Sequence, residues 1–288
     1  MQPGAPPPSR RSLLLRAAGL AACAVPALAL ASAPRFSWPG GARGAVSLTY
    51  DDGLNSQLDY AVPQLQAEDL KATFFLVQEN MEARVADWER VARLGHEIGD
   101  HTENHPCSLG DYSARSFEST EIAPMERFLD SNFGRSPERV YAYPCGFIGL
   151  GQGPAHDRFG RYAEALERNF IAARTTVGPP IDPRLASAQR LHLAGFEPTY
   201  DVDSAALAFW YLREAMRQGR WAILIFHGVL PQRTREGETS AGVHQQILQF
   251  IRTQPLWCAT MGEVFRYASG APAAAVMPSP PTAAPPRR

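Results

Sequence analysis

Short apolar runs recur along the middle of the chain, and most of them are continuous instead of alternating with polar residues. Continuous runs of this length are typical of strands that are buried on both faces of a sheet. The strands expected on this basis are 45–50, 72–77, 96–100, 140–143, 170–175, 191–196, 221–226 and 256–260.

Segments with apolar residues three and four positions apart separate many of these runs, and this spacing predicts amphipathic helices. The expected helices are 57–70, 84–95, 116–134, 162–169, 204–219 and 244–253. Gly95 and Gly134 are expected to end two of them. Since strands alternate with helices, the sequence predicts an α/β domain over residues 44–269, with a parallel sheet that is open or closed into a barrel.

The start of the chain has the pattern of an export signal. Residues 1–33 combine Arg10 and Arg11 with an apolar stretch and a run of small residues near its end. The arginine pair, followed by Ser and leucines, resembles a twin-arginine signal. We therefore expect an exported protein, periplasmic or extracellular, with cleavage near Ala31 or Ala33. The stretch "LAAC" leaves an alternative, a lipoprotein anchored through Cys23.

The segments on either side of the domain are expected to lie outside the fold, and the composition excludes some classes of function. Residues 34–43 are expected to be a linker, and the Pro- and Ala-rich residues 270–288 a disordered tail. The formal net charge is −1, so there is no basic field for nucleic acid. Lys71 is the only lysine, which leaves almost no candidate for Schiff-base or P-loop chemistry. No run beyond the signal is long enough to span a bilayer.

Polar residues follow four of the expected strands directly. They are Asp51 and Asp52 after the first, His101 and then His105 after the third, Pro144-Cys145-Gly146 after the fourth, and His227 after the seventh. In parallel α/β folds, sites are built at the carboxyl ends of the strands. The sequence therefore predicts that these side chains gather at one rim of the sheet.

The stretch "HTENH" suggests a metal site. A spacing of four places His101 and His105 on one face of a helical turn. Two neutral imidazoles with one carboxylate, from either Asp51 or Asp52, would form an open site for a divalent ion, most readily Zn²⁺, with Co²⁺ or a similar ion as an alternative. The cation would also offset the repulsion between Asp51 and Asp52. The alternatives are a surface turn for the histidines and a helix cap or turn for the aspartates.

The motifs "TYDDG", "HTENH", "YPCG" and "ILIFHG", in this order, resemble those of the polysaccharide deacetylase family, the NodB-homology carbohydrate esterases. The resemblance covers residues 44–265. It implies a distorted (β/α)7 barrel and a metal-dependent enzyme that removes acetyl groups, mostly N-acetyl groups, from an acetylated oligo- or polysaccharide.

The resemblance also implies roles for individual residues. They are metal binding for Asp52, His101 and His105, general base for Asp51, general acid for His227, an oxyanion-hole N–H at Cys145, and substrate contacts for Tyr143, Pro144 and Ile225. The activity could instead be that of an O-acetyl esterase or a non-sugar amide hydrolase, or the chain could be a sugar-binding relative without activity. The oligomeric state does not follow from the sequence.

The chain departs from the family pattern at three places, one of which is Gly228 after His227, where many members have Asp. The arginine that usually stands two residues before the proline of the third motif, where it holds the base aspartate, is Ala142 here. Arg174, at the end of another expected strand, is a candidate replacement, although it could equally pair with a structural carboxylate. The family's Asp-Trp motif has only a distant counterpart in residues 200–210.

Two cysteines flank the expected rim. Cys107 follows His105 by two residues, and Cys145 lies in the third motif, after the next expected strand. Consecutive parallel strands are usually neighbours, so the two thiols should lie close together. In an oxidising compartment this favours a Cys107–Cys145 disulfide, with Cys258 buried and reduced. The alternative is that both thiols pack as small hydrophobic groups.

Overall fold

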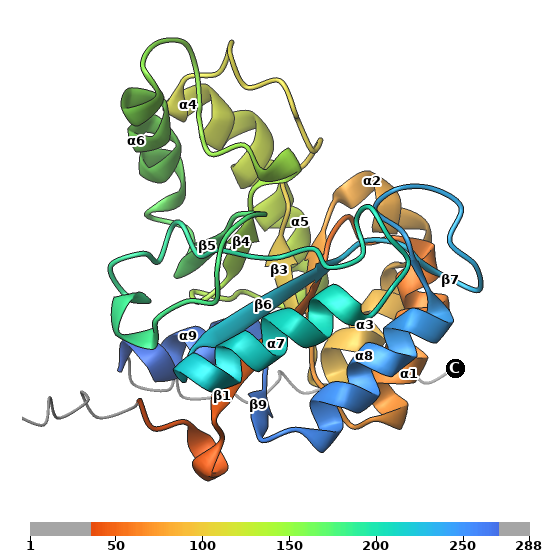
Figure 1. Cartoon of the computed structure of the whole chain (residues 1–288). Coiled ribbons are helices and arrows are strands. Elements are labelled where there is room, and N and C mark those ends of the chain that lie inside the picture. Colours follow the sequence, from red (N-terminus) through yellow and green to blue (C-terminus); the bar gives the residue numbers. More distant parts are fainter. Residues whose placement is uncertain (1–35, 271–288) are drawn as a thin grey trace, which may run out of the picture. The chain divides into compact units, whose positions relative to one another are not determined.

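The first apolar run forms the central strand of the sheet, β1 (Gly44–Tyr50), and all seven of its residues are buried. The computed structural model describes residues 36–270 (Figure 1). In it β1 pairs in parallel along one side with β6 (Trp221–Phe226). Along its other side it pairs with β9 (Leu256–Cys258) near its start and with β2 (Thr73–Leu76) near its end.

The sheet continues in parallel from β2 through β3 (Glu97–Asp100), β4 (Val140–Ala142) and β5 (Ala172–Arg174). Residues 191–196, expected to be a strand, lie between β5 and β6 but form only isolated bridges to them. Leu193 N–H donates to Ala173 O, and Phe196 N–H donates to Ile223 O. The segment thus divides its pairing between two strands, and the sheet curls round as the predicted barrel requires.

Gly195 permits this close passage between β5 and β6. A Cβ at position 195 would lie 2.7 Å from Thr175 O and 2.6 Å from Cδ1 of Ile225, so any larger residue would force the strands apart.

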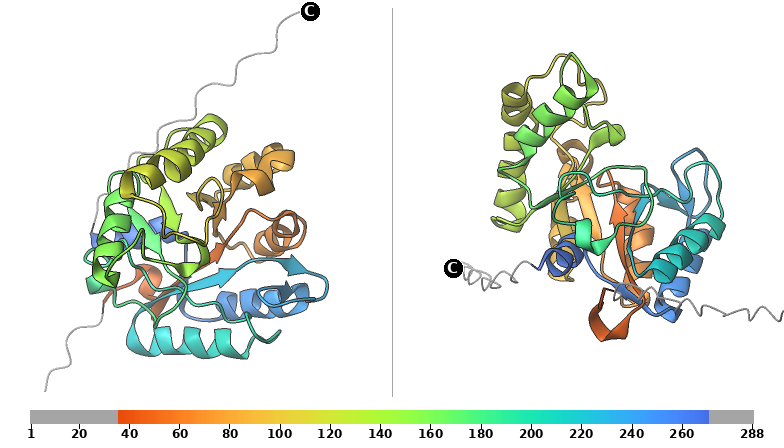
Figure 2. Two further views of the ribbon diagram at one scale, coloured as in Figure 1. Left: turned by 90° about the horizontal axis from the view of Figure 1, so that it is seen from above. Right: turned by 60° about the vertical axis from the view of Figure 1, so that its left-hand side comes forward.

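The helices surround the strands, as the view from above in Figure 2 shows. They are α1 (Val62–Ala67), α2 (Gln78–Met81), α3 (Val85–Arg93), α4 (Ala114–Phe117), α5 (Ala123–Phe133), α6 (Ala155–Leu166), α7 (Ala206–Gln218), α8 (Ala241–Thr253) and α9 (Met261–Ser269). Two π-helical stretches, Gln57–Ala61 and Glu118–Ile122, lead into α1 and α5. The expected helices 57–70 and 116–134 therefore run through these irregular turns, whereas α2 and α9 were not predicted.

Shorter elements connect these parts. They are the two-stranded pair β7 (Val229–Leu230) and β8 (Thr239–Ser240), and the 3₁₀ turns Pro39–Gly41, Glu82–Arg84, Pro144–Gly146 and Pro183–Leu185. Gly95 and Gly134, expected as helix ends, follow α3 and α5 with φ of 86° and 82°. Such values favour glycine because it lacks a Cβ.

The flanking predictions fall largely outside the described residues. The export signal, the alternative lipid anchor at Cys23 and the tail after Gly270 all lie there. Of the expected linker, residues 36–43 are described, and Trp38 is buried, with Nε1–H donating to Gly219 O. This part of the expected linker therefore packs against the domain. Within residues 36–270, no helix has the length and apolar character needed to cross a membrane.

Candidate active site

The carboxyl ends of β1 and β3 bring Asp52, His101 and His105 together. Asp52 follows β1 with a φ of 79°, so the extended backbone of the strand ends before it. Its Oδ1 lies 3.6 Å from Nε2 of His101 and 3.6 Å from Nε2 of His105. One ligand atom from each residue can be chosen so that all three lie within 4.8 Å of one another.

His101 is buried and held with one ring nitrogen available. Its backbone N–H continues the ladder by donating to Leu76 O, and its Nδ1–H donates to Ala142 O at 2.9 Å. Nε2 therefore carries the lone pair that faces Asp52. Burial lowers the pKa of His101 to about 4, so the ring is neutral at pH 7, as a metal ligand requires.

The prediction that His101 and His105 lie on a helical turn is wrong. Residues 101–105 form a loop in which Thr102 and His105 have φ of 71° and 49°. The loop is fixed by Thr102 N–H, which donates to Asp100 Oδ1, and by His105 N–H, which donates to Thr102 Oγ1. The two imidazoles still meet edge to face, with ring centroids 4.6 Å apart.

These three residues fit a divalent cation. Separations of 3.6 Å are too long for hydrogen bonds. Two atoms that each lie about 2.1 Å from a common ion are roughly 3.0 to 3.4 Å apart at octahedral to tetrahedral angles. Oδ1 of Asp52 makes no salt bridge to an arginine or lysine within the described residues. Two imidazole nitrogens and one carboxylate oxygen are suitable ligands for Zn²⁺ or Co²⁺.

Asp51 is buried beside this set and is paired with Arg174, the candidate replacement for the missing arginine. Arg174 Nη2 donates to Asp51 Oδ1, and both side chains are almost fully buried. The guanidinium also lies over the ring of Phe75. Burial by itself raises the pKa of Asp51, but the charge and hydrogen bond of Arg174 and the charge of His227 outweigh it and lower the pKa below its ordinary value. Asp51 is therefore a carboxylate at neutral pH.

His227, directly after β6, faces Asp51 from the other side. Its Nε2 lies 4.0 Å from Asp51 Oδ2, and its Nδ1–H donates to Glu197 Oε1 at 2.8 Å. Burial lowers the pKa of His227, but the bond to Glu197 and the charge of Asp51 raise it to about 9. The imidazole is thus protonated at neutral pH, with Nε2–H directed toward the centre of the site.

Glu197 is the site residue that the sequence analysis missed. It follows the expected strand 191–196 directly, so the signal that identified Asp51 and His227 applied to it as well. The distant Asp-Trp counterpart at residues 200–210 does not supply this partner. Its Asp203 accepts from Ser240 N–H instead.

The third motif lies next to His105. The structure joins Cys107 and Cys145 in a disulfide with Cα atoms 5.7 Å apart, and Cys107 Sγ is 3.9 Å from His105 Nδ1. Cys145 has a φ of 54°, so its backbone turns sharply after Pro144. Cys258 is free and only half-buried by surface exposure, and burial of its thiol raises its pKa to about 12.

The three residues predicted to contact substrate are all buried. Tyr143 lies in the core, where its hydroxyl donates to Leu191 O. Pro144 is buried, and so is Ile225, which pairs with Thr49 in the sheet. Their roles stay predictions. Asp52 and His227 instead line a shared hollow of about 240 Å³.

Comparison with known proteins agrees with this architecture. Residues 40–151 match the family described as polysaccharide deacetylase. This segment holds the first three motifs, and the resemblance is therefore confirmed over residues 44–151 of the predicted 44–265. The match ends before Arg174, Glu197 and His227.

A named relative is similar in sequence over part of the chain. A peptidoglycan-N-acetylglucosamine deacetylase from Bacillus cereus is 33% identical over 99 residues, which are 34% of this chain and 35% of the relative. This chain thus matches about a third of that protein's length.

Solved structures share the fold. A candidate polysaccharide deacetylase from Mycobacterium smegmatis superposes with a TM-score of 0.60 at 18% identity, over 83% of this chain and 94% of that one. A family 4 acetyl xylan esterase from Clostridium thermocellum, solved with a cobalt ion, gives 0.53 at 19% identity, over 79% and 93%. The predicted fold class, the NodB-type (β/α) barrel, is confirmed.

Proposed function

We propose that this chain is a metal-dependent deacetylase that hydrolyses acetyl groups, most often N-acetyl groups, on a carbohydrate. One observation carries the proposal. An ionised Asp51 and a protonated His227 face each other across the carboxyl ends of β1 and β6, beside a set of two histidines and one aspartate. The deacetylase activity in the name of the Bacillus cereus relative supports the same reaction.

Asp52, His101 and His105 would hold the cation. When bound, a divalent ion such as Zn²⁺ or Co²⁺ supplies Lewis-acid polarisation of the acetyl carbonyl and lowers the pKa of water at the site. The acetyl xylan esterase of the same fold was solved with cobalt, which supports a transition-metal site here.

Asp51 is the proposed general base. Its carboxylate accepts the proton of the attacking water while Oδ1 stays bonded to Arg174, so Oδ2 is the atom that takes up the proton. Arg174 fixes the orientation of the carboxylate and keeps it charged.

His227 is the proposed general acid. Nε2–H delivers its proton to the nitrogen of the departing amine, which is too basic to leave as an anion. Glu197 holds the other ring nitrogen and stabilises the protonated imidazole. The backbone N–H of Cys145, which the disulfide ties to the loop after His105, is the proposed donor to the oxygen of the acetyl carbonyl as negative charge develops on it.

We also propose that the protein acts outside the cytoplasm, after export directed by residues 1–33. The exposed disulfide between Cys107 and Cys145 supports this location, because disulfides persist in oxidising compartments.

The test is acetate release by the metal-loaded protein from chitin oligomers, peptidoglycan fragments, acetylxylan and acetylated exopolysaccharide. We expect release from at least one N-acetylated substrate. Asp51→Asn should keep the metal and lose about a hundred- to ten-thousand-fold in kcat, because an amide cannot accept the proton. Release only from O-acetylated substrates would identify an esterase. Metal binding without release from any substrate would contradict the proposal.

A further inference from the structure

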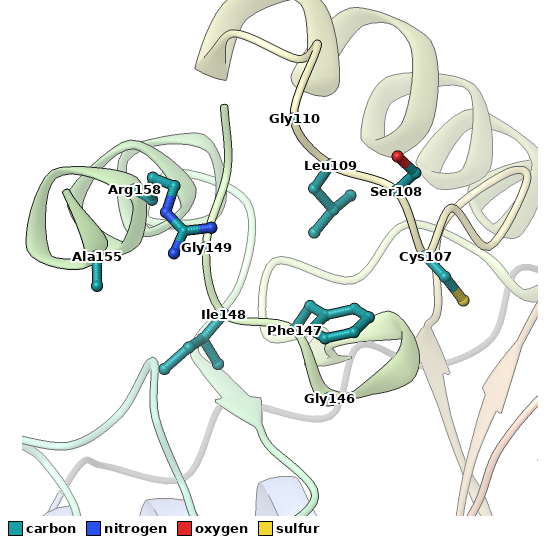
Figure 3. Close-up of a pocket in the computed structure, with 10 residues that line it drawn as sticks. All are labelled: Cys107, Ser108, Leu109, Gly110, Gly146, Phe147, Ile148, Gly149, Ala155 and Arg158. Carbon is teal, nitrogen blue, oxygen red and sulfur yellow. The ribbon is translucent and has the colours of Figure 1, made fainter. Parts of the chain in front are cut away.

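A hollow of about 440 Å³ lies beside the candidate site (Figure 3). Three segments build it: the loop after His105, the loop after Cys145, and the start of α6. Its lining residues are Cys107, Ser108, Leu109, Gly110, Gly146, Phe147, Ile148, Gly149, Ala155 and Arg158. The first two segments are joined by the disulfide, so this side of the hollow is held in place.

The hollow lies next to His105, one of the candidate metal ligands. Cys107, in its wall, has its Sγ 3.9 Å from His105 Nδ1. Asp52 and His227 line a separate hollow. His105 separates the two, since its Nε2 faces Asp52 and its Nδ1 faces Cys107. An oligosaccharide bound across the site would therefore place one sugar unit in the larger hollow.

Arg158 sets the charge of this hollow. It is the one charged residue among the ten that line it, and none of them is acidic. Its Nε is buried without a hydrogen-bond partner, and no described residue forms an ion pair with its guanidinium. In Figure 3 the guanidinium points toward Gly149, where a Cβ would lie 3.5 Å from Cζ. A half-buried cation without a counter-charge is costly, and an anionic ligand would remove that cost.

Phe147 gives the hollow an apolar surface next to this charge. The residue is 53% exposed, although large apolar side chains are usually covered, and in Figure 3 its ring lies below Leu109 and to the right of Ile148. An exposed aromatic face is suited to packing against the apolar face of a sugar ring.

We propose that this hollow is a subsite for an anionic sugar unit of the substrate, next to the unit that is deacetylated. The guanidinium of Arg158 pairs with a carboxylate or phosphate on that unit, since its fork of N–H donors matches both groups, and Phe147 packs on the ring. The inference rests on the proposed function and adds the substrate class: an acidic, acetylated glycan.

The proposal can be tested by measuring ligand binding in a variant that does not turn over the substrate. The probes are N-acetylated tetrasaccharides of one length that carry a hexuronate, its methyl ester, or a phosphate monoester. Affinities are measured by calorimetry on the full chain carrying Asp51→Asn, loaded with Zn²⁺. We expect the hexuronate or the phosphate to bind about tenfold more tightly than the neutral ester, the scale of one charged hydrogen-bonding pair. Whichever of the two anionic probes binds more tightly than the neutral ester identifies the anionic group, carboxylate or phosphate, that the subsite recognises.

Arg158 variants in the same background assign the gain to the residue. Arg158→Gln should abolish the preference for the anion, and Arg158→Lys should keep part of it because the charge stays. Arg252→Gln, which removes an exposed charge on α8, should keep all of it. Equal affinity for anionic and neutral probes, or a preference that survives in Arg158→Gln, would overturn the proposal.

The outcome is separable from the proposed function. If the protein with Asp51 intact releases no acetate from any probe while the Arg158-dependent preference is present, the subsite stands and deacetylation does not. If acetate is released from all probes with equal KM, deacetylation stands and the subsite does not.

Discussion

Ala142 and Arg174 are register partners on the neighbouring parallel strands β4 and β5. The arginine expected two residues before the proline of the third motif is thus replaced by one at the paired position of the next strand. Paired residues project to the same face of a sheet. Arg174 can therefore reach Asp51 from one strand further along the barrel, and the ion pair is formed although position 142 is an alanine.

Arg174→Ala should damage both stability and activity. It leaves the carboxylate of Asp51 buried without its cation, and breaking a buried pair in this way typically costs about 3 to 5 kcal/mol. We expect a loss of that order in chemical denaturation and at least a tenfold fall in kcat. Arg174→Lys should be milder because it keeps the charge.

The register predicts a rescue. Ala142→Arg combined with Arg174→Ala should recover part of the lost activity, because the new guanidinium starts from the same level of the sheet. Near-native activity and stability in Arg174→Ala alone would show that Asp51 does not depend on this pair.

His101→Ala and His105→Ala should each reduce the metal content of the purified protein, because each removes one of the three ligands. Elemental analysis after dialysis against Zn²⁺ measures this. His156→Ala is the matched control, since His156 is highly exposed and lies outside the site. Full metal occupancy in both ligand variants would show that His101 and His105 do not bind the metal.

Much of this site could be predicted because it follows one rule. Asp51, Asp52, His101 and His227 all lie at the carboxyl end of an expected strand, and parallel strands gather such residues at one rim. Glu197 obeys the same rule, but an acidic residue after a short run carries no spacing that distinguishes it from a surface residue. Its role becomes visible only when β6 brings His227 beside it.

The errors have local causes. The histidine spacing predicts a helical turn, but positive φ at Thr102 and His105 makes a loop, and spacing alone does not report φ. Helix α9 could have been predicted, because Thr260 caps it by accepting from Glu263 N–H and Gly270 ends it. The interrupted pairing of residues 191–196 depends on contacts with two strands far apart in sequence.

Glu197→Gln should lower the pKa of His227 in the metal-free protein. At present the imidazole remains protonated up to a pH of about 9, and the hydrogen bond to Glu197 is a main cause. Replacing the carboxylate by a neutral amide removes its charge, so the pKa should move toward the ordinary value of about 6.5. NMR titration of the His227 ring measures it, and His156 provides an internal reference.

Stability should follow the same shift. Because the pKa of His227 is raised in the folded state, its contribution is complete below the unfolded pKa and is lost as the pH rises through about 9. The difference in unfolding free energy between the native protein and Glu197→Gln should therefore be largest below about pH 6.5 and decline to a small value by about pH 9. A pKa that does not change in the variant would assign the shift to Asp51 instead.

The disulfide between Cys107 and Cys145 should support both the fold and the site. It closes a loop of 38 residues in sequence, which contributes about 4 kcal/mol in the loop-entropy model. It also ties the backbone of Cys145, the proposed oxyanion donor, to the loop that carries His105. Cys107→Ser with Cys145→Ser should therefore unfold at lower denaturant concentration and lose kcat more than it raises KM. Cys258→Ser is the control, because its thiol is free and far from the rim in sequence.

Peptide mapping under non-reducing conditions, on protein from an oxidising compartment, provides the direct measurement. Finding Cys107 and Cys145 both open to alkylation after unfolding would contradict the disulfide, while a linked pair with an unchanged kcat in the double variant would limit its role to stability.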